Sequence, residues 1–183
     1  MDRQMLLSCT DRGKFLGKYI NRKKAHLGKG VKHLAIAVLI FNKAGKVLLQ
    51  KRKHKVFNNI WDLTGATHPL HLKNGDETFE EATKRCLKRE WGISPTSSTS
   101  GGLRGIKKVG AFSYFAQDGK RCENEYCALM VGEYDGKIKL NKEVGYGYKW
   151  RDKEKFLEDI KKNPYKYSAW AVEGMKILVA SDL

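Results

Sequence analysis

Residues 77–93, ETFEEATKRCLKREWGI, predict an amphipathic helix that carries its own start and stop signals. Thr78 with Glu81 three positions later is a capping-box pattern, and Gly92 is placed to end the helix. The apolar side chains between these signals form one stripe, consisting of Phe79, Ala82, Cys86 and Leu87. We therefore expect a helix that packs one face on a core, which the chain re-enters at Ile93.

The segment before this helix predicts a β-hairpin followed by a loop. Residues 33–41 and 46–52 are rich in apolar and β-branched side chains, and the turn-forming residues 42–45 separate them. The longest apolar run, residues 34–41, is too short to span a membrane and is typical of a buried strand. Glycine, proline and an Asn-Gly pair punctuate residues 63–76, which predicts a loop without regular structure.

The segment after the helix predicts a second hairpin. Residues 94–102 are small and polar, as in a flexible loop with no chemistry of its own. Residues 108–116 and 121–134 predict two strands that face each other across an Asp-Gly turn at 118–119. Because side chains alternate along a strand, one face of the second strand carries Glu123, Glu125 and Cys127.

Two amphipathic helices, at residues 153–162 and 169–180, are expected to close the chain. The length of 183 residues fits one domain, and 41% hydrophobic residues are enough for a core. Neither a repeat nor a linker interrupts the pattern. We therefore expect a single α+β domain in which helices flank a mixed β-sheet.

The cysteines and the N-terminus favour a cytoplasmic location. The four cysteines form no Cys-x-x-Cys pair and no zinc-finger spacing, as expected of reduced thiols. The apolar patch at residues 5–7 is too short for the core of a signal peptide. We therefore expect neither export nor membrane insertion.

The formal net charge of +16 favours anionic partners, from diphosphates to nucleic acids. The basic residues are spread over the whole chain, and no recognised nucleic-acid motif accompanies them. Nucleic acid is therefore a possible partner that the charge alone does not favour, and much of the lysine content is expected to be solvated surface. The oligomeric state is left open.

Residues 77–93 resemble a Nudix box, G-x5-E-x7-R-E-U-x-E-E-x-G-U, in which U is apolar. The positions on pattern are Glu77, Arg85, Leu87, Glu90, Gly92 and Ile93. His71 stands at the leading glycine, while Cys86 and Arg89 replace two glutamates. A Nudix box presents carboxylates to divalent cations that neutralise a diphosphate. The alternative is an ordinary helix on which Glu81 and Arg85 form an i,i+4 pair.

The flanking residues extend the resemblance to the type I isopentenyl-diphosphate isomerase family over residues 5–175. They are His26, His33, Trp61, His68-Pro69, Tyr114, Glu123-Asn124-Glu125 and Trp170. The resemblance implies one Nudix-type α/β/α sandwich over residues 1–183. Its core is expected over about 30–165, with an N-terminal strand and a C-terminal helix packed on it. It also implies a small isoprenoid diphosphate as substrate.

The resemblance also implies a ligand set for two cations. A divalent ion (manganese, zinc or magnesium) is expected in a cage formed by His26, His33, His68, Glu123 and Glu125, a donor set that suits such ions. Glu90, aided by the backbone carbonyl of residue 66, is expected to hold a magnesium ion that enters with the diphosphate. Residues of the substrate site are expected at Arg22, Arg52 and Lys55 for the diphosphate and at Trp170 for a developing carbocation.

Ala66 departs from the family at a catalytic position. The isomerase adds a proton to one face of a double bond and removes one from the other, using a cysteine and a glutamate. The glutamate position is Glu125, with Tyr114 near it, but the cysteine position is Ala66, whose methyl group has no proton to exchange. Three functions therefore stay open: an isomerase-type enzyme with doubtful isomerase chemistry, a Nudix hydrolase of a diphosphate, and a non-catalytic binder of a diphosphate or nucleic acid.

Overall fold

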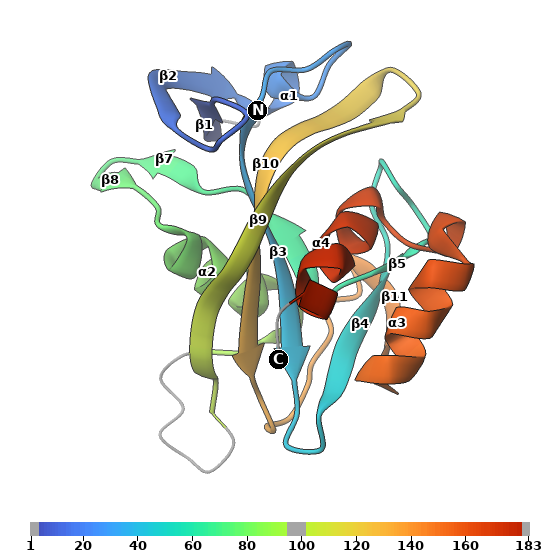
Figure 1. The fold of residues 1–183 in the computed structure, drawn as a ribbon. Coiled ribbons are helices and arrows are strands. Elements are labelled where there is room, and N and C mark those ends of the chain that lie inside the picture. Colours follow the sequence, from blue (N-terminus) through green and yellow to red (C-terminus); the bar gives the residue numbers. More distant parts are fainter. Residues whose placement is uncertain (1–3, 95–101, 181–183) are drawn as a thin grey trace.

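A mixed β-sheet lies between helices on both of its faces (Figure 1). The computed structural model describes residues 4–94 and 102–180, so most of the loop predicted at 94–102 lies outside the described residues. The central strands are, in spatial order, β9 (Arg104–Asp118), β10 (Arg121–Glu133), β3 (His33–Phe41), β4 (Lys46–Arg52) and β11 (Gly145–Asp152). Strands β10 and β3 are parallel, and the other neighbours in this order are antiparallel. Both predicted hairpins are confirmed, although β9 begins earlier than expected.

The helices cover the two faces of this sheet, which confirms the predicted α+β sandwich. Helix α2 (Phe79–Trp91) packs on one face, and α3 (Lys153–Lys162) and α4 (Ala169–Ala180) pack on the other (Figure 1). Alternate residues of β3 separate the two cores: Ala37 belongs to the α3/α4 side and Val38 to the α2 side. No helix in the described ranges has the length and apolar character needed to cross a membrane.

Helix α2 begins and ends as its sequence predicts. The Thr78 hydroxyl accepts a hydrogen bond from the Glu81 backbone N–H at 3.1 Å, and the Thr78 N–H donates to the Glu81 carboxylate at 2.8 Å. Gly92 ends the helix in the left-handed conformation, with φ of 65°. The expected alternative of an i,i+4 pair is wrong, because Arg85 instead binds Glu77 through two nitrogens, at 2.7 and 2.8 Å.

The N-terminal segment lies across one end of the sheet. Strands β1 (Met5–Cys9) and β2 (Phe15–Asn21) form a hairpin that leads into the short helix α1 (Arg22–Ala25). Strand β1 also pairs with β3, where Ser8 is opposite His33. This pairing brings the residues that follow α1 close to the start of β3.

The prediction of a plain loop at 63–76 is wrong, because this segment contains short strands. Three short strands lie in it, which are β6 (Gly65–Thr67), β7 (Leu70–Leu72) and β8 (Gly75–Asp76), and β5 (Trp61–Asp62) lies directly before it. Strand β6 pairs with β3, β7 pairs with β1, and β5 pairs with β4. Strand β11 and the 3-10 turn η1 (Pro164–Lys166) were also missing from the prediction. These pairings fix the segment around Ala66 against the central strand.

Candidate functional site

Three histidines and two glutamates from four separate segments meet at one point. The ligand-type atoms of His26, His33, His68, Glu123 and Glu125 all lie within 4.8 Å of one another. His26 follows α1, His33 opens β3, His68 lies between β6 and β7, and the glutamates are on β10. The parallel pairing places Glu125 directly opposite His33. We call this group the cage.

Backbone contacts fix the orientation of two of the imidazole rings. The Nδ1 atom of His26 lies 2.7 Å from the carbonyl oxygen of Arg22, and that of His33 lies 2.7 Å from the carbonyl oxygen of Val31. A carbonyl only accepts hydrogen bonds, so each Nδ1 carries the proton in the neutral ring. The Nε2 lone pairs are therefore presented to the cage, which is the arrangement that metal-binding histidines adopt.

The cage residues fit a divalent cation. The His26 Nε2 atom lies 2.9 Å from Glu123 Oε2, yet both atoms, like His33 Nε2, are buried without a hydrogen-bond partner among the described residues. Lone pairs that face each other in this way are satisfied by a cation between them. Ligands on opposite sides of an ion bound at ~2.0–2.2 Å are ~4.0–4.4 Å apart, which is compatible with the observed spread. Three imidazoles and two carboxylates suit manganese or zinc.

Glu125 connects the cage to Tyr114. Its Oε1 atom lies 2.8 Å from His68 Nε2, and its Oε2 atom accepts a hydrogen bond of 2.5 Å from the Tyr114 hydroxyl. Burial, together with the charge of Glu125, raises the pKa of Tyr114 well above its ordinary value, so the phenol stays protonated and donates. Burial alone would raise the pKa of Glu125, but contacts with His33, Glu123 and Tyr114 outweigh it and lower the pKa. Glu125 is thus held as a carboxylate between a donor and the cage.

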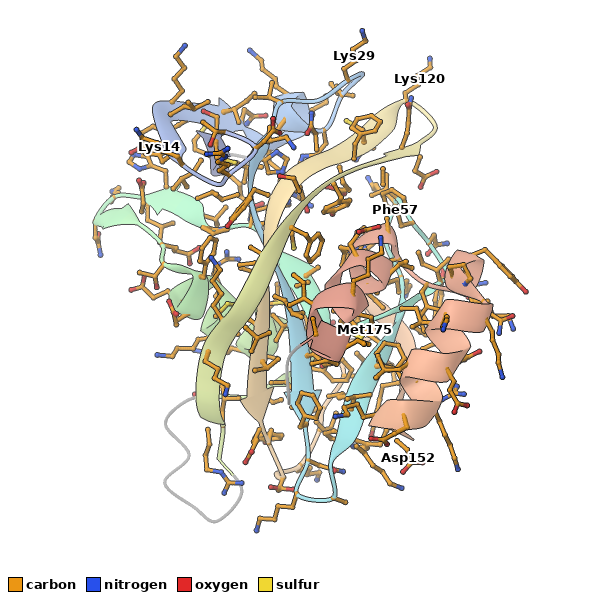
Figure 2. All side chains as sticks on the ribbon, viewed as in Figure 1. Lys14, Lys29, Phe57, Lys120, Asp152 and Met175 are labelled. Carbon is orange, nitrogen blue, oxygen red and sulfur yellow. The ribbon has the colours of Figure 1, made fainter. Side chains whose placement is uncertain are left out.

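A cavity of about 370 Å³ opens beside the cage and has a strongly basic lining. Five basic side chains line it: Arg22, Arg52, Lys55, Arg89 and Arg121. Its apolar lining residues are Ile36, Val56, Ala66, Val144 and Trp170. The predicted substrate residues Arg22, Arg52, Lys55 and Trp170 therefore all face the same cavity. Figure 2 shows Lys29 and Lys120 at the end of the molecule that holds α1 and the β9–β10 turn.

Arg52 is held rigidly in this lining. Its Nη1 atom donates to Asp62 at 2.7 Å, and its Nε donates to the Phe57 carbonyl at 3.2 Å. Its guanidinium lies 4.6 Å from the centre of the Trp170 ring, which itself meets the Phe57 ring edge to face at 5.4 Å. Asp62 therefore positions a basic side chain of the cavity.

Glu90 lies apart from the cage, and protein donors bind both of its carboxylate oxygens. It is 1% exposed. Arg89 lies 2.5 Å from its Oε1 atom, and the Gln50 amide donates to its Oε2 atom at 3.1 Å. Strand β6 passes close by, because a Cβ atom added at Gly65 would lie 3.1 Å from Glu90 Oε2. The expected second cation would have to compete with these donors.

Ala66 lines the cavity without supplying a titratable group, and no cysteine of the chain compensates for it. All four cysteines are free and buried, and none lines the cavity. Cys86 lies on the far side of β6, where its sulfur would be 2.9 Å from a Cβ atom added at Gly65. Burial raises the pKa of Cys86 and of Cys127 well above the ordinary value. Both are therefore inert thiols at neutral pH.

The cavity includes residues that the sequence prediction did not assign to it. These are Gln4, His54, Thr67, Arg89 and Arg121 among its polar lining residues. Burial and then the charges of Arg52 and Arg89 lower the pKa of His54 to about 4, so its imidazole is neutral at pH 7. The sequence held one signal, because Arg121 lies two residues before Glu123 and so shares its strand face. His54 carries no comparable signal.

The sandwich, the capped helix α2 and the cage of metal-ligand-type side chains together indicate the class of protein. The model of the NUDIX domain matches residues 31–171, and the chain belongs to this family.

Within the family, the chain is similar to a curated Isopentenyl-diphosphate Delta-isomerase from Serratia proteamaculans. The two are 28% identical over 158 residues, which cover 85% of this chain and 81% of the relative. A crystal structure from Deinococcus radiodurans has the same fold, with a TM-score of 0.67, 17% identity and coverage of 93% of this chain and 96% of that chain. A MutT NUDIX hydrolase from Burkholderia pseudomallei matches with a TM-score of 0.58 and 16% identity, covering 80% of this chain and 98% of that chain. These two structures indicate the fold alone.

Proposed function

We propose that this chain is a metal-dependent Nudix protein of the isopentenyl-diphosphate isomerase type that binds a small isoprenoid diphosphate. The observation that carries the proposal is the convergence of five ligand-type side chains within 4.8 Å, with buried lone pairs that lack partners in the part of the chain that the structure describes. A divalent cation bound among these atoms would satisfy them together. A divalent ion bound there would hold Glu125 in place and withdraw charge from it.

The diphosphate is assigned to the basic lining of the cavity. Arginine side chains bind phosphate oxygens through paired N–H donors, and Arg22 and Arg52 supply such donors beside Lys55. The alkenyl part is assigned to the neighbouring apolar lining, where the Trp170 ring can stabilise positive charge. A small isoprenoid diphosphate is compatible with a cavity of about 370 Å³.

Proton transfer is where this chain differs from an intact isomerase. Glu125 and Tyr114 are in hydrogen-bond contact and can exchange a proton with a bound alkene. The position that should exchange the other proton is the methyl group of Ala66. We therefore expect binding of the isoprenoid diphosphate with little isomerisation.

The test is to incubate metal-loaded protein with isopentenyl diphosphate and to quantify dimethylallyl diphosphate and free phosphate separately. Ala66→Cys adds a thiol to the cavity wall and is expected to raise isomer formation clearly above that of the parent protein. Ala66→Ser is the matched control, because a serine hydroxyl adds similar bulk but is far too weak an acid. No binding by the parent protein and no isomer from Ala66→Cys would refute the proposal.

The same experiment separates the two alternatives. Release of phosphate or pyrophosphate by the parent protein would identify a Nudix hydrolase, for which the box is poorly equipped because Cys86 and Arg89 replace two carboxylates. Binding of RNA that weakens steeply with salt and ignores added metal would identify a nucleic-acid binder.

A further inference from the structure

We propose that Arg89 replaces the second divalent cation of the diphosphate site, so that the cavity binds a diphosphate through arginine side chains without magnesium. The inference rests on the proposed function, because it concerns how the same cavity holds its anionic ligand.

Glu90 already has a counter-charge and a hydrogen-bond donor within the protein. This carboxylate is almost completely buried, and a buried carboxylate requires a counter-charge. Arg89 supplies that charge through a contact of 2.5 Å to Oε1, while Gln50 occupies Oε2 at 3.1 Å. The carboxylate is therefore already neutralised and hydrogen-bonded by the protein.

Magnesium does not fit the contacts that Arg89 and Gln50 make with Glu90. Magnesium requires near-octahedral oxygen ligands at ~2.0–2.1 Å and gives up its water reluctantly. At Glu90 it would have to displace a guanidinium from the same oxygen, and it would then lie beside that like charge. The glutamate that the Nudix box usually places at position 89 is also absent, so a second carboxylate ligand is missing.

Arg89 also faces the cavity in which the diphosphate is proposed to bind. It lines the cavity together with Arg22, Arg52 and Arg121. Its side chain is 39% exposed, and its contacts to the described residues, which are Glu90 and the Cys86 sulfur, use only Nη2. The Nε and Nη1 donors are thus available for phosphate oxygens. A guanidinium that is anchored on one side and open on the other can do both tasks of the ion: it neutralises Glu90 and binds the diphosphate.

The experiment uses inorganic pyrophosphate as the probe and isothermal titration calorimetry of the full chain with its cage loaded with manganese. Binding is measured with and without magnesium. Wild-type protein is expected to bind with the same affinity in both buffers. Arg89→Gln is expected to bind about 10- to 100-fold more weakly without magnesium, the loss of a hydrogen-bonded charged group. Lys88→Gln removes an exposed charge from the same helix turn outside the cavity, and it should bind like wild type.

Arg89→Glu tests the replacement directly. It restores the glutamate of the Nudix box beside Glu90, and it should make pyrophosphate binding depend on magnesium. Arg89→Lys keeps the charge but loses the planar fork, so an intermediate affinity is expected without magnesium. Circular dichroism and urea unfolding check that each variant is folded. If Arg89→Gln does not fold, Arg89→Lys replaces it in the comparison.

The inference is overturned if wild-type binding requires magnesium, if Arg89→Gln binds as tightly as wild type, or if pyrophosphate does not bind at all. Competition by isopentenyl diphosphate separates this inference from the proposed function. Magnesium-independent pyrophosphate binding that isopentenyl diphosphate does not compete with would keep the arginine site and refute the isoprenoid substrate. Magnesium-dependent binding of isopentenyl diphosphate would refute the arginine site and keep the isoprenoid substrate.

Discussion

Removing one cage histidine should abolish the part of the protein's stability that depends on metal. His33 is the sharpest choice because its side chain has no exposed surface and its Nε2 atom lacks a hydrogen-bond partner within residues 4–94 and 102–180. It also lies opposite Glu125 across the parallel strand pair. The substitution His33→Ala removes one of the five ligand-type side chains and leaves the other four on their own strands and loops.

The size of the effect follows from ligand linkage. A cation present at 100 times its dissociation constant stabilises the folded state by about 2.7 kcal/mol. For a domain of this size that corresponds to a rise in Tm of about 5–11 °C. Loss of a ligand that weakens binding about 100-fold leaves about 0.4 kcal/mol, or about 1–2 °C, at the same metal concentration. His33→Ala also loses a hydrogen bond to Val31 and leaves a cavity, but these costs apply with and without metal.

The assay therefore compares two variants by the change in Tm that metal causes in each. Thermal unfolding is followed by calorimetry for metal-free protein and for protein with added manganese, and the metal-dependent rise in Tm is compared between variants. His71→Ala is the matched control, because His71 is a partly exposed histidine outside the cage that pairs with Asp76 at 2.7 Å. It should keep the full rise. An unchanged rise in His33→Ala, or an equal loss in His71→Ala, would refute the assignment of the cage as the metal site.

Metal affinity should be greatest above the pKa of His26 and should fall by about tenfold per pH unit below it, because the cation must displace one proton. Contact with Glu123 outweighs the effect of burial and raises the pKa of His26 above its ordinary value. Metal titrations between about pH 8 and pH 6 should therefore show the fall in affinity. An affinity that does not change over this range would contradict the prediction. Separately, Gly65→Ala should lower the free energy of unfolding by about 1–3 kcal/mol, because the new Cβ would lie 2.9 Å from the Cys86 sulfur. Gly147→Ala should not lower it, because no atom of the described residues beyond its chain neighbours lies within 4 Å of the new Cβ. Equal urea midpoints for the two variants would contradict the packing argument.

The sequence predicted the long elements of the fold because each carries a local pattern. Strands β3 and β10 are long enough to show alternation or a continuous apolar run, and α2 carries both of its caps. The parallel contact between β3 and β10 is different, because it joins segments about 90 residues apart and nothing local specifies it. The cage depends on that contact, which is why its residues came from a family resemblance rather than from the pattern of either strand.

The short strands could not be predicted in the same way. Strands β5 to β8 have two or three residues each, too few to show a period, and they exist because neighbouring strands offer them hydrogen bonds. Strand β11 contains Gly145 and Gly147, which disfavour a strand locally, yet it pairs along the whole of β4. Tertiary pairing overrides the weak local signal in both cases, and β6 is the element that places Ala66 in the cavity wall.

The pairing of Arg89 with Glu90 also required the structure, because side chains one position apart on a helix do not normally face each other. Here Glu90 points into the core while the longer Arg89 lies at the edge and reaches back to it. The exchange of a glutamate for arginine in the box therefore adds the cation that the remaining glutamate needs. Under the proposed function, Ala66 would have a parallel effect on the chemistry, since it would remove a proton-exchanging group and leave the basic lining intact. Both changes would then preserve the means to bind a diphosphate while reducing the means to transform it, so binding should be tested before turnover in any assay of this protein.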